Sequence, residues 1–146
     1  MAELEGARLL VFLAGGRRYA CSIDAVREII PARPATRLPG APSAVIGLIN
    51  LRGRLVTVVD LAAQLDARDA NAPRPGGGSI VLLESGSRMI GVLVDEVRDV
   101  RTAAAGATDP LQREESMPAV LQALARFADG TAVVIDPGAL VAHVLS

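Results

Sequence analysis

The sequence feature that most constrains the fold is an internal repeat. A shift of 71 positions superimposes part of the second half of the chain on the first half. The equivalent residues at this shift are Gly15 and Gly86, Arg17 and Arg88, Asp24 and Asp95, Val26 and Val97, Arg27 and Arg98, and Glu28 and Asp99. A second match, at a shift of 76, places residues 131–136 on residues 55–60. Two matches in the same order, with nearly equal shifts, indicate a duplicated unit.

Each copy of the unit has the pattern of a small β structure. Short apolar runs rich in Val, Leu and Ile alternate with glycine-bearing turns, which is typical of strands joined as hairpins. Asp60 and Asp136 each end such a run ahead of a short helical stretch, and Pro137 suits the first position of a helix. The predicted fold class is therefore all-β (mainly), with two intertwined five-stranded β-barrel subdomains from the duplicated unit and short helices.

The chain length fits a single domain covering residues 1–146. Residues 66–78, DARDANAPRPGGG, are polar, rich in Pro and Gly, and without periodicity, as expected of a linker. We therefore predict a first subdomain at about residues 8–65, a linker at about 66–78, and a second subdomain at about 79–146. Residues 108–118 are predicted to form a polar loop within the second subdomain.

The polar tetrapeptide at residues 50–53, Asn-Leu-Arg-Gly, joins two apolar runs and is predicted to form the turn of a hairpin. An unpaired guanidinium within apolar surroundings is costly, so Arg52 must reach either water or a carboxylate. Glu28 lies in another apolar run and is a candidate partner. The alternative is that both residues are solvated ends of strands. In the second copy Ala128 and Asp129 replace Arg52 and its glycine, so we expect only the first copy to carry a polar feature at this turn.

The composition excludes several classes of partner. Hydrophobic residues make up 51% of the chain and aromatic residues only 2%, so the core must be aliphatic. The net charge is −1, and the arginines are scattered rather than clustered, which predicts no nucleic-acid partner. No apolar run reaches the ~18 residues of a membrane-spanning helix, so membrane insertion is not expected. The N-terminal residues lack the features of a signal peptide, which predicts a cytoplasmic location.

The residues that catalysis would require do not form a recognisable group. His143 is the single histidine and Cys21 the single cysteine, too few for a metal site at ligand spacing. Asp95 and Glu96 are adjacent, and neighbouring residues of an extended chain point to opposite faces. The glycines at 76–78 precede a strand, whereas phosphate-binding glycines follow one. We predict that the chain is not an enzyme and that it has no catalytic, cofactor-binding or metal site.

Several segments, taken in order, resemble the CheW family of chemotaxis coupling proteins. The matching segments are Leu10-Val11-Phe12, Tyr19-Ala20, Val26-Arg27-Glu28-Ile29-Ile30, Val45-Ile46-Gly47-Leu48-Ile49-Asn50-Leu51-Arg52-Gly53 and Val59-Asp60-Leu61. The resemblance covers nearly the whole chain, and its most specific part is Asn-Leu-Arg-Gly with the upstream Val-x-Glu-Ile. It implies a CheW-like fold of two five-stranded barrels with a hydrophobic groove between them.

The resemblance also implies a function. Proteins of this family are non-enzymatic adaptors that couple methyl-accepting chemoreceptors to a chemotaxis histidine kinase, at receptor arrays on the inner face of the membrane. The signalling tip of the receptor, a helical hairpin, would dock in the groove, and the regulatory domain of the kinase would bind at the barrel ends. The expected receptor-binding groove comprises Val26, Ile30, Val45, Ile46, Gly47 and Arg52.

Other site residues follow from the same resemblance. A structural ion pair between Glu28 and Arg52 is expected at neighbouring strands. Gly91 and Val100 are candidates for kinase coupling. Gly47 is expected to let a partner helix approach the backbone closely at a surface. The segment 120–124 departs from the family pattern, so the alternative is a receptor-side adaptor that does not engage the kinase.

Overall fold

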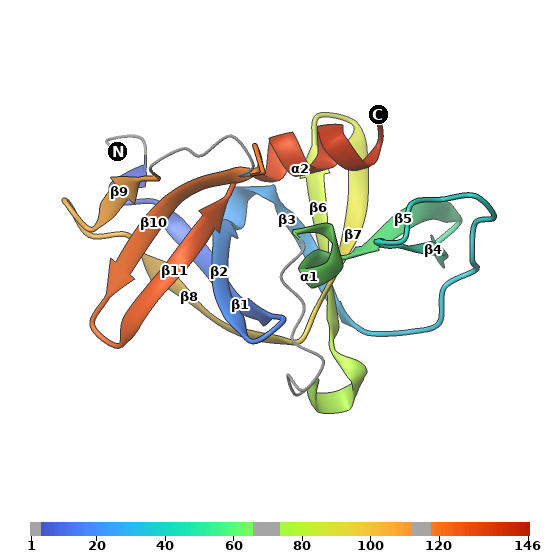
Figure 1. Cartoon of the computed structure of the whole chain (residues 1–146), viewed down its shortest axis with the longest axis horizontal. Coiled ribbons are helices and arrows are strands. Elements are labelled where there is room, and N and C mark those ends of the chain that lie inside the picture. The colour runs from blue at the N-terminus through green and yellow to red at the C-terminus, as the bar shows by residue number, and fades with distance from the viewer. Residues whose placement is uncertain (1–3, 66–73, 112–117) are drawn as a thin grey trace.

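The computed structural model describes residues 4–65, 74–111 and 118–146, and Figure 1 shows two sheets side by side. Most of the described chain is β-strand, and the helices are short. The elements are β1 (Arg8–Ala14), β2 (Arg17–Ser22), η2 (Ile23–Ala25), β3 (Val26–Pro31), β4 (Val45–Leu51), β5 (Arg54–Asp60), α1 (Leu61–Gln64), η3 (Pro75–Gly77), β6 (Ser79–Ser85), β7 (Arg88–Val94), β8 (Glu96–Thr102), β9 (Thr108–Pro110), β10 (Leu121–Phe127), β11 (Gly130–Ile135) and α2 (Pro137–Val144).

The two sheets exchange strands between the two halves of the chain. Sheet 1 has the strand order β8-β1-β2-β11-β10-β9, and sheet 2 has the order β3-β6-β7-β5-β4. Sheet 1 therefore combines two strands of the first copy with four of the second, while sheet 2 combines three of the first with two of the second. The predicted all-β, intertwined fold is confirmed. Neither sheet is built from one continuous half of the chain. The predicted subdomain limits near residues 65 and 79 therefore describe the sequence repeat and remain a prediction.

The registers of the two parallel strand pairs are related by the internal repeat that the sequence indicated. In sheet 1, β2 and β11 are parallel and Tyr19 is opposite Val133. In sheet 2, β7 and β5 are parallel and Ile90 is opposite Thr57. Ile90 is the equivalent of Tyr19 at a shift of 71, and Val133 is the equivalent of Thr57 at a shift of 76. Each parallel pair thus joins a strand from one copy to a strand from the other, in the same register in both sheets.

One short strand was not expected. Residues 108–118 were predicted to be a polar loop, but β9 begins this segment and pairs with β10, with Asp109 opposite Leu124. The first copy has a smaller counterpart, an isolated bridge between Thr36 and Leu48. The sequence did not predict this strand, because an edge strand of three residues buries little surface and can consist of polar residues. Residues 112–117 of the predicted loop and 66–73 of the predicted linker lie outside the described residues.

The buried side chains form three hydrophobic clusters, and successive residues of β1 belong to different ones. Leu9 and Val11 of β1 point into sheet 1, where they meet alanines of β2, β10 and β11. Leu10 and Phe12 of the same strand point the other way, into a central cluster shared with β5, β6, β7 and both helices. A third cluster fills the interior of sheet 2. Strands buried on both faces are what the continuous apolar runs of the sequence require.

The helices begin where the sequence predicted. Asp60 caps α1, its carboxylate accepting from the backbone N–H of Ala63 at 3.4 Å. Asp136 caps α2 in the same way, accepting from Ala139 N at 3.2 Å, and Pro137 is the first helical residue. Helix α2 packs on β6 and β7 of sheet 2, so it joins the two sheets (Figure 1). Across the described ranges, neither helix has the length and apolar character needed to cross a membrane.

Candidate functional site

The turn between β4 and β5 presents Arg52 at the end of sheet 2. Arg52 has φ 51° and Gly53 has φ 84°, so both central residues are in the left-handed region that a type I′ hairpin requires. Asn50 supports the turn, since its Oδ1 accepts from Gly53 N at 2.8 Å. Arg52 is the one non-glycine residue with positive φ among residues 4–65, 74–111 and 118–146. The turn sequence thus fixes where its guanidinium emerges.

Arg52 Nη2 donates to Glu28 Oε1, as the sequence suggested. The two residues do not lie on neighbouring strands, however, because β3 and β4 are the opposite edges of sheet 2. The pair therefore spans the seam where the sheet curls back on itself. The Arg52 side chain is 69% exposed and that of Glu28 34% exposed, so the arginine of the pair lies at the surface. The hydrogen bond to Glu28 raises the pKa of Arg52, which keeps its charge fixed.

Other contacts close the same seam. Arg33, just past β3, donates from Nη2 to the Asn50 carbonyl oxygen at 2.7 Å. Thr36 and Leu48 exchange two backbone hydrogen bonds, each at 2.8 Å. Arg33 and Thr36 both belong to the segment that connects β3 to β4. Together with the Glu28–Arg52 pair, these contacts close sheet 2 into a barrel.

Gly47 has a different role from the one expected. It is buried, and a Cβ built on it would lie 2.2 Å from the Thr36 carbonyl oxygen and 2.7 Å from the Thr36 carbonyl carbon. The backbone that approaches Gly47 is thus the protein's own connecting segment rather than a partner helix. The expectation of a surface glycine is wrong, because the connecting segment covers Gly47 where Thr36 pairs with Leu48. The sequence does not predict this pairing. Gly47 is needed for barrel closure.

The other expected groove residues fall into two groups. Val26 on β3 and Val45 on β4 are partly exposed and pack against the central cluster between the sheets. Ile30 and Ile46, on the same two strands, pack instead against the interior cluster of sheet 2. A shift of register between Val45 and Gly47 separates the directions of the neighbouring side chains on β4. Only Val26 and Val45 therefore flank the region between the two sheets.

The two expected kinase-coupling residues also differ. Gly91 on β7 faces the interior of sheet 2, and a Cβ there would lie 2.9 Å from Ile80 Cγ2 and 3.1 Å from Val58 Cγ2. A substitution at Gly91 would act through the core. Val100 on β8 is 40% exposed, and its equivalent in the first copy, Ile29, is 42% exposed. Val100 is thus available to a partner, whereas Gly91 is not.

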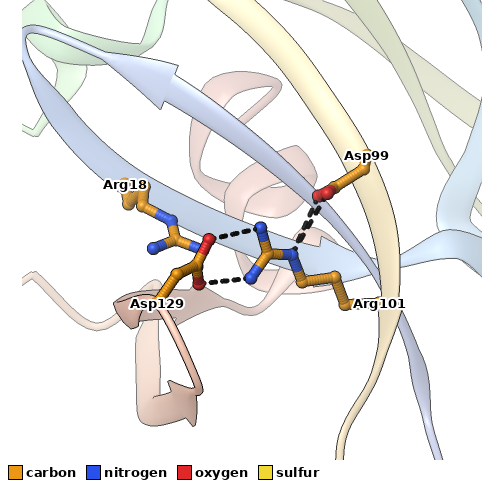
Figure 2. Close-up of polar contacts among 4 residues, drawn as sticks. All are labelled: Arg18, Asp99, Arg101 and Asp129. Carbon is orange, nitrogen blue, oxygen red and sulfur yellow. Dashed lines mark hydrogen bonds and ion pairs between the residues drawn. The ribbon is translucent and has the colours of Figure 1, made fainter.

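The corresponding end of sheet 1 has an ionic network that the sequence analysis missed. Asp129, in the β10–β11 turn, accepts from Arg101 Nη2 at 2.8 Å and from Arg18 Nη2 at 3.1 Å (Figure 2). Arg101 also donates from Nε to Asp99 Oδ1 at 3.1 Å. Both guanidinium groups lie near the Phe127 ring, at 5.8 Å from its centroid for Arg18 and 5.2 Å for Arg101. The expectation that only the first copy has a polar turn is wrong.

The turns at the two ends carry opposite charges. At the end of sheet 2 the turn carries a cation, Arg52, and the strand a carboxylate, Glu28. At the end of sheet 1 the turn carries a carboxylate, Asp129, and strand β8 carries Asp99, the equivalent of Glu28, together with a cation, Arg101. Hydrogen bonds from Arg101 and Arg18 hold the pKa of Asp129 well below its ordinary value, and hydrogen bonds to Asp129 and Asp99 raise the pKa of Arg101.

The repeat itself was the signal that could have revealed this network. It places Asp129 at the position of Gly53, in the turn that corresponds to the Arg52 turn, and Asp99 at the position of Glu28. Two carboxylates that face each other across a barrel end repel each other unless a cation lies between them. Arg101, two residues after Asp99 and therefore on the same face of an extended strand, was the available one.

The isolated reactive residues have ordinary surroundings. Cys21 is fully buried in the central cluster, and burial raises the pKa of its thiol to about 12. His143 is exposed on α2. In the parts of the chain that the structure describes, no three His, Cys, Asp or Glu residues lie close enough together to hold a metal ion.

Comparison with known proteins gives consistent results. The family model described as the CheW-like domain matches residues 8–145. The chain is 38% identical over 100 residues to a chemotaxis protein CheW of Rhizobium meliloti (strain 1021), which covers 68% of this chain and 63% of that protein. It is 32% identical over 102 residues to chemotaxis protein CheW of Bacillus subtilis (strain 168), covering 69% and 64%. These alignments span somewhat less than two thirds of the curated relatives' length.

The fold agrees with a solved structure of the same kind. The scaffolding protein TtCheW from Thermoanaerobacter tengcongensis superposes with a TM-score of 0.80 at 22% identity, covering 90% of this chain and 89% of that one. At this identity the likeness establishes the fold. The family match extends from β1 to the end of the last helix and agrees with this fold, so the chain belongs to the CheW-like domain family.

Proposed function

We propose that this chain is a non-enzymatic adaptor that couples chemoreceptors to a chemotaxis histidine kinase in a signalling array on the cytoplasmic face of the membrane. The observation that carries the proposal is the match of the CheW-like domain to residues 8–145. Relatives in that family are named as chemotaxis and scaffolding proteins. The separation of His143 from Cys21, one exposed and one buried, also favours a binding role over catalysis.

The receptor-binding surface is proposed to lie along β3 and β4, where these strands border the central cluster. Val26 and Val45 supply partly exposed apolar surface there, and Arg52 with Glu28 supplies charge at the barrel end. An apolar face of a receptor helix would bury the two valines, as in other helix-in-groove contacts. Ile30 and Ile46 would support these strands from the interior of sheet 2, and Gly47 would act by keeping the barrel closed.

The test measures the affinity for a purified receptor signalling tip. Val26→Glu should weaken binding by about tenfold or more, because it removes apolar contact area and introduces a charge into the contact. Val97→Glu is the matched control. Val97 is the equivalent residue in the second copy and is also partly buried against the central cluster. Equal losses in both variants, or no loss in Val26→Glu, would contradict the assignment of receptor binding to β3.

A second function is favoured by the acidic turn at the end of sheet 1. A kinase domain that recognises an arginine-bearing turn would meet Asp129 there instead. The chain would then be a receptor-side adaptor that does not engage the kinase. Binding of the receptor tip, with no binding of the kinase regulatory domain at concentrations where a canonical relative binds both, would support this alternative.

A further inference from the structure

Arg74 reaches two buried carboxylates from the segment that precedes β6. Its Nε donates to Asp95 Oδ1 at 2.8 Å, and its Nη2 donates to Asp60 Oδ2 at 3.1 Å. Asp60 is 4% exposed and Asp95 3% exposed, while the Arg74 side chain is 30% exposed. Buried carboxylates are costly without a compensating cation. One guanidinium compensates both, because its planar arrangement of donors directs Nε to one carboxylate and Nη2 to the other.

The remaining oxygens of the two carboxylates hold backbone groups from different elements. Asp60 Oδ1 caps α1 at Ala63 N. Asp95 Oδ2 accepts from Gly16 N, in the β1–β2 turn, at 3.4 Å. The Asp95 backbone N–H also donates to the Leu13 carbonyl oxygen at 2.8 Å. The Arg74 cluster, defined as Arg74, Asp60 and Asp95, therefore connects the end of β5 in sheet 2 to the first hairpin of sheet 1.

The position of Asp95 gives this cluster its significance. Asp95 is the one residue between the end of β7 in sheet 2 and the start of β8 in sheet 1. The chain passes between the sheets a second time, through η2, where Asp24 is the equivalent residue. Asp24 is exposed, and its backbone N–H bonds to Ser22 Oγ at 3.3 Å. The two crossings are equivalent in the repeat, but an arginine from outside the repeat holds the Asp95 crossing.

We propose that Arg74 is a positioning residue that fixes the orientation of the two sheets at the Asp95 crossing. It does so by binding both carboxylates, so that the hairpin held by Asp95 and the helix capped by Asp60 keep one arrangement. This role does not depend on the adaptor function proposed above. The binding strands β3 and β4 belong to sheet 2, whereas the ionic network of Figure 2 lies at the end of sheet 1. The orientation of the two sheets therefore sets the relation between these two surfaces.

The experiment measures the distance between the sheets directly. Spin labels are attached to Leu55→Cys in sheet 2 and Thr131→Cys in sheet 1, two exposed and equivalent positions. Cys21 does not compete for the label, because it is buried and its pKa is raised to about 12. Distance distributions are recorded by pulsed electron paramagnetic resonance. Arg74→Met keeps the aliphatic stem of the side chain and removes its charge.

Arg98→Met is the matched control. Arg98 also forms an ion pair, with Glu96 at 2.8 Å, but its side chain is 54% exposed and it lies beyond the crossing. We expect Arg74→Met to broaden or shift the distance distribution, and Arg98→Met to leave it unchanged. Amide exchange of Gly16 should accelerate by about a hundredfold in Arg74→Met, since one partner has been removed from a buried pair.

Two further variants separate positioning from simple stabilisation. Replacing the carboxylates as well, in Arg74→Met with Asp60→Asn and Asp95→Asn, should raise the melting temperature again because no buried charge is left unpaired, but the distance distribution should stay broad because no guanidinium joins the two positions. Arg74→Lys should give a distance distribution of intermediate width, and this variant is measured in place of Arg74→Met if Arg74→Met does not fold. A narrow wild-type distribution in Arg74→Met or Arg74→Lys, with only the melting temperature lowered, would overturn the proposal.

Discussion

Gly47→Ala tests whether the connecting segment after β3 closes the barrel of sheet 2. A Cβ at this position would lie 2.2 Å from the Thr36 carbonyl oxygen and 3.1 Å from Arg37 N. These neighbours are backbone atoms and cannot rotate away. The segment that carries Thr36 must therefore move outward, which breaks its two backbone hydrogen bonds to Leu48.

The magnitude follows from these two effects and from the strain of an alanine at φ 150°, which costs about 1–3 kcal/mol. Each lost backbone hydrogen bond costs about 0.5–1.5 kcal/mol, and inserting a methyl group into a packed site costs about 1–3 kcal/mol. The effects overlap, because moving the segment relieves part of the clash. We therefore expect Gly47→Ala to lower the free energy of unfolding by about 3 kcal/mol.

Urea denaturation followed by circular dichroism measures this change, and Gly40→Ala is its control. Gly40 lies in the same connecting segment and also has positive φ, 78°, but a Cβ there would meet nothing within 4 Å. Gly40→Ala should cost only the backbone strain of a left-handed alanine, about 1–2 kcal/mol. If Gly47→Ala is no more destabilising than Gly40→Ala, Thr36 does not pack on Gly47 and the account of barrel closure fails.

Three further predictions concern individual side chains. Glu28→Gln and Arg52→Ala should leave the melting temperature nearly unchanged, because the pair is exposed, but should weaken partner binding; a large loss of stability would contradict this. Cys21 should resist thiol reagents at pH 8 until the protein is unfolded in urea, since burial raises its pKa to about 12, and labelling of the folded protein would count against it. The pKa of Asp129 is depressed in the folded protein, so its stabilising contribution is present above its ordinary value of 3.8 and disappears as the pH falls through the folded pKa. In an NMR titration Asp129 should titrate below 3.8 and return toward 3.8 in Arg101→Ala; titration near 3.8 in the wild type would refute the network.

The sequence was sufficient to predict the repeat and the strand-rich fold, although not the short strand β9. Strands and hairpins follow from local patterns, and Asp60 and Asp136 were recognisable as helix caps from their place before helical stretches. From the sequence we could predict that the two barrels are intertwined, but not which strands each half contributes to each sheet. Alternation of apolar residues shows that a strand is buried, but does not show which neighbour it pairs with. The equivalence of Tyr19 with Ile90 becomes informative only once their parallel partners are known.

The site was harder to predict because it depends on contacts between distant segments. Glu28 and Arg52 were identified, but their separation on opposite edges of sheet 2 was not. The role of Gly47 depends on where the backbone of Thr36 passes, and no property of either residue indicates that path. The network around Asp129 forms only because the registers of β2, β8 and β10 bring its members together.

The measurement that tests the central claim most directly is reconstitution of the wild-type chain with a purified receptor signalling tip and a purified kinase regulatory domain. Sedimentation velocity of the three-component mixture shows whether one complex contains all three. The adaptor account predicts a ternary complex, together with both binary complexes. The receptor-side alternative predicts a binary complex with the receptor tip alone. Binding to neither partner, by a chain whose folding is verified by circular dichroism, would contradict the account.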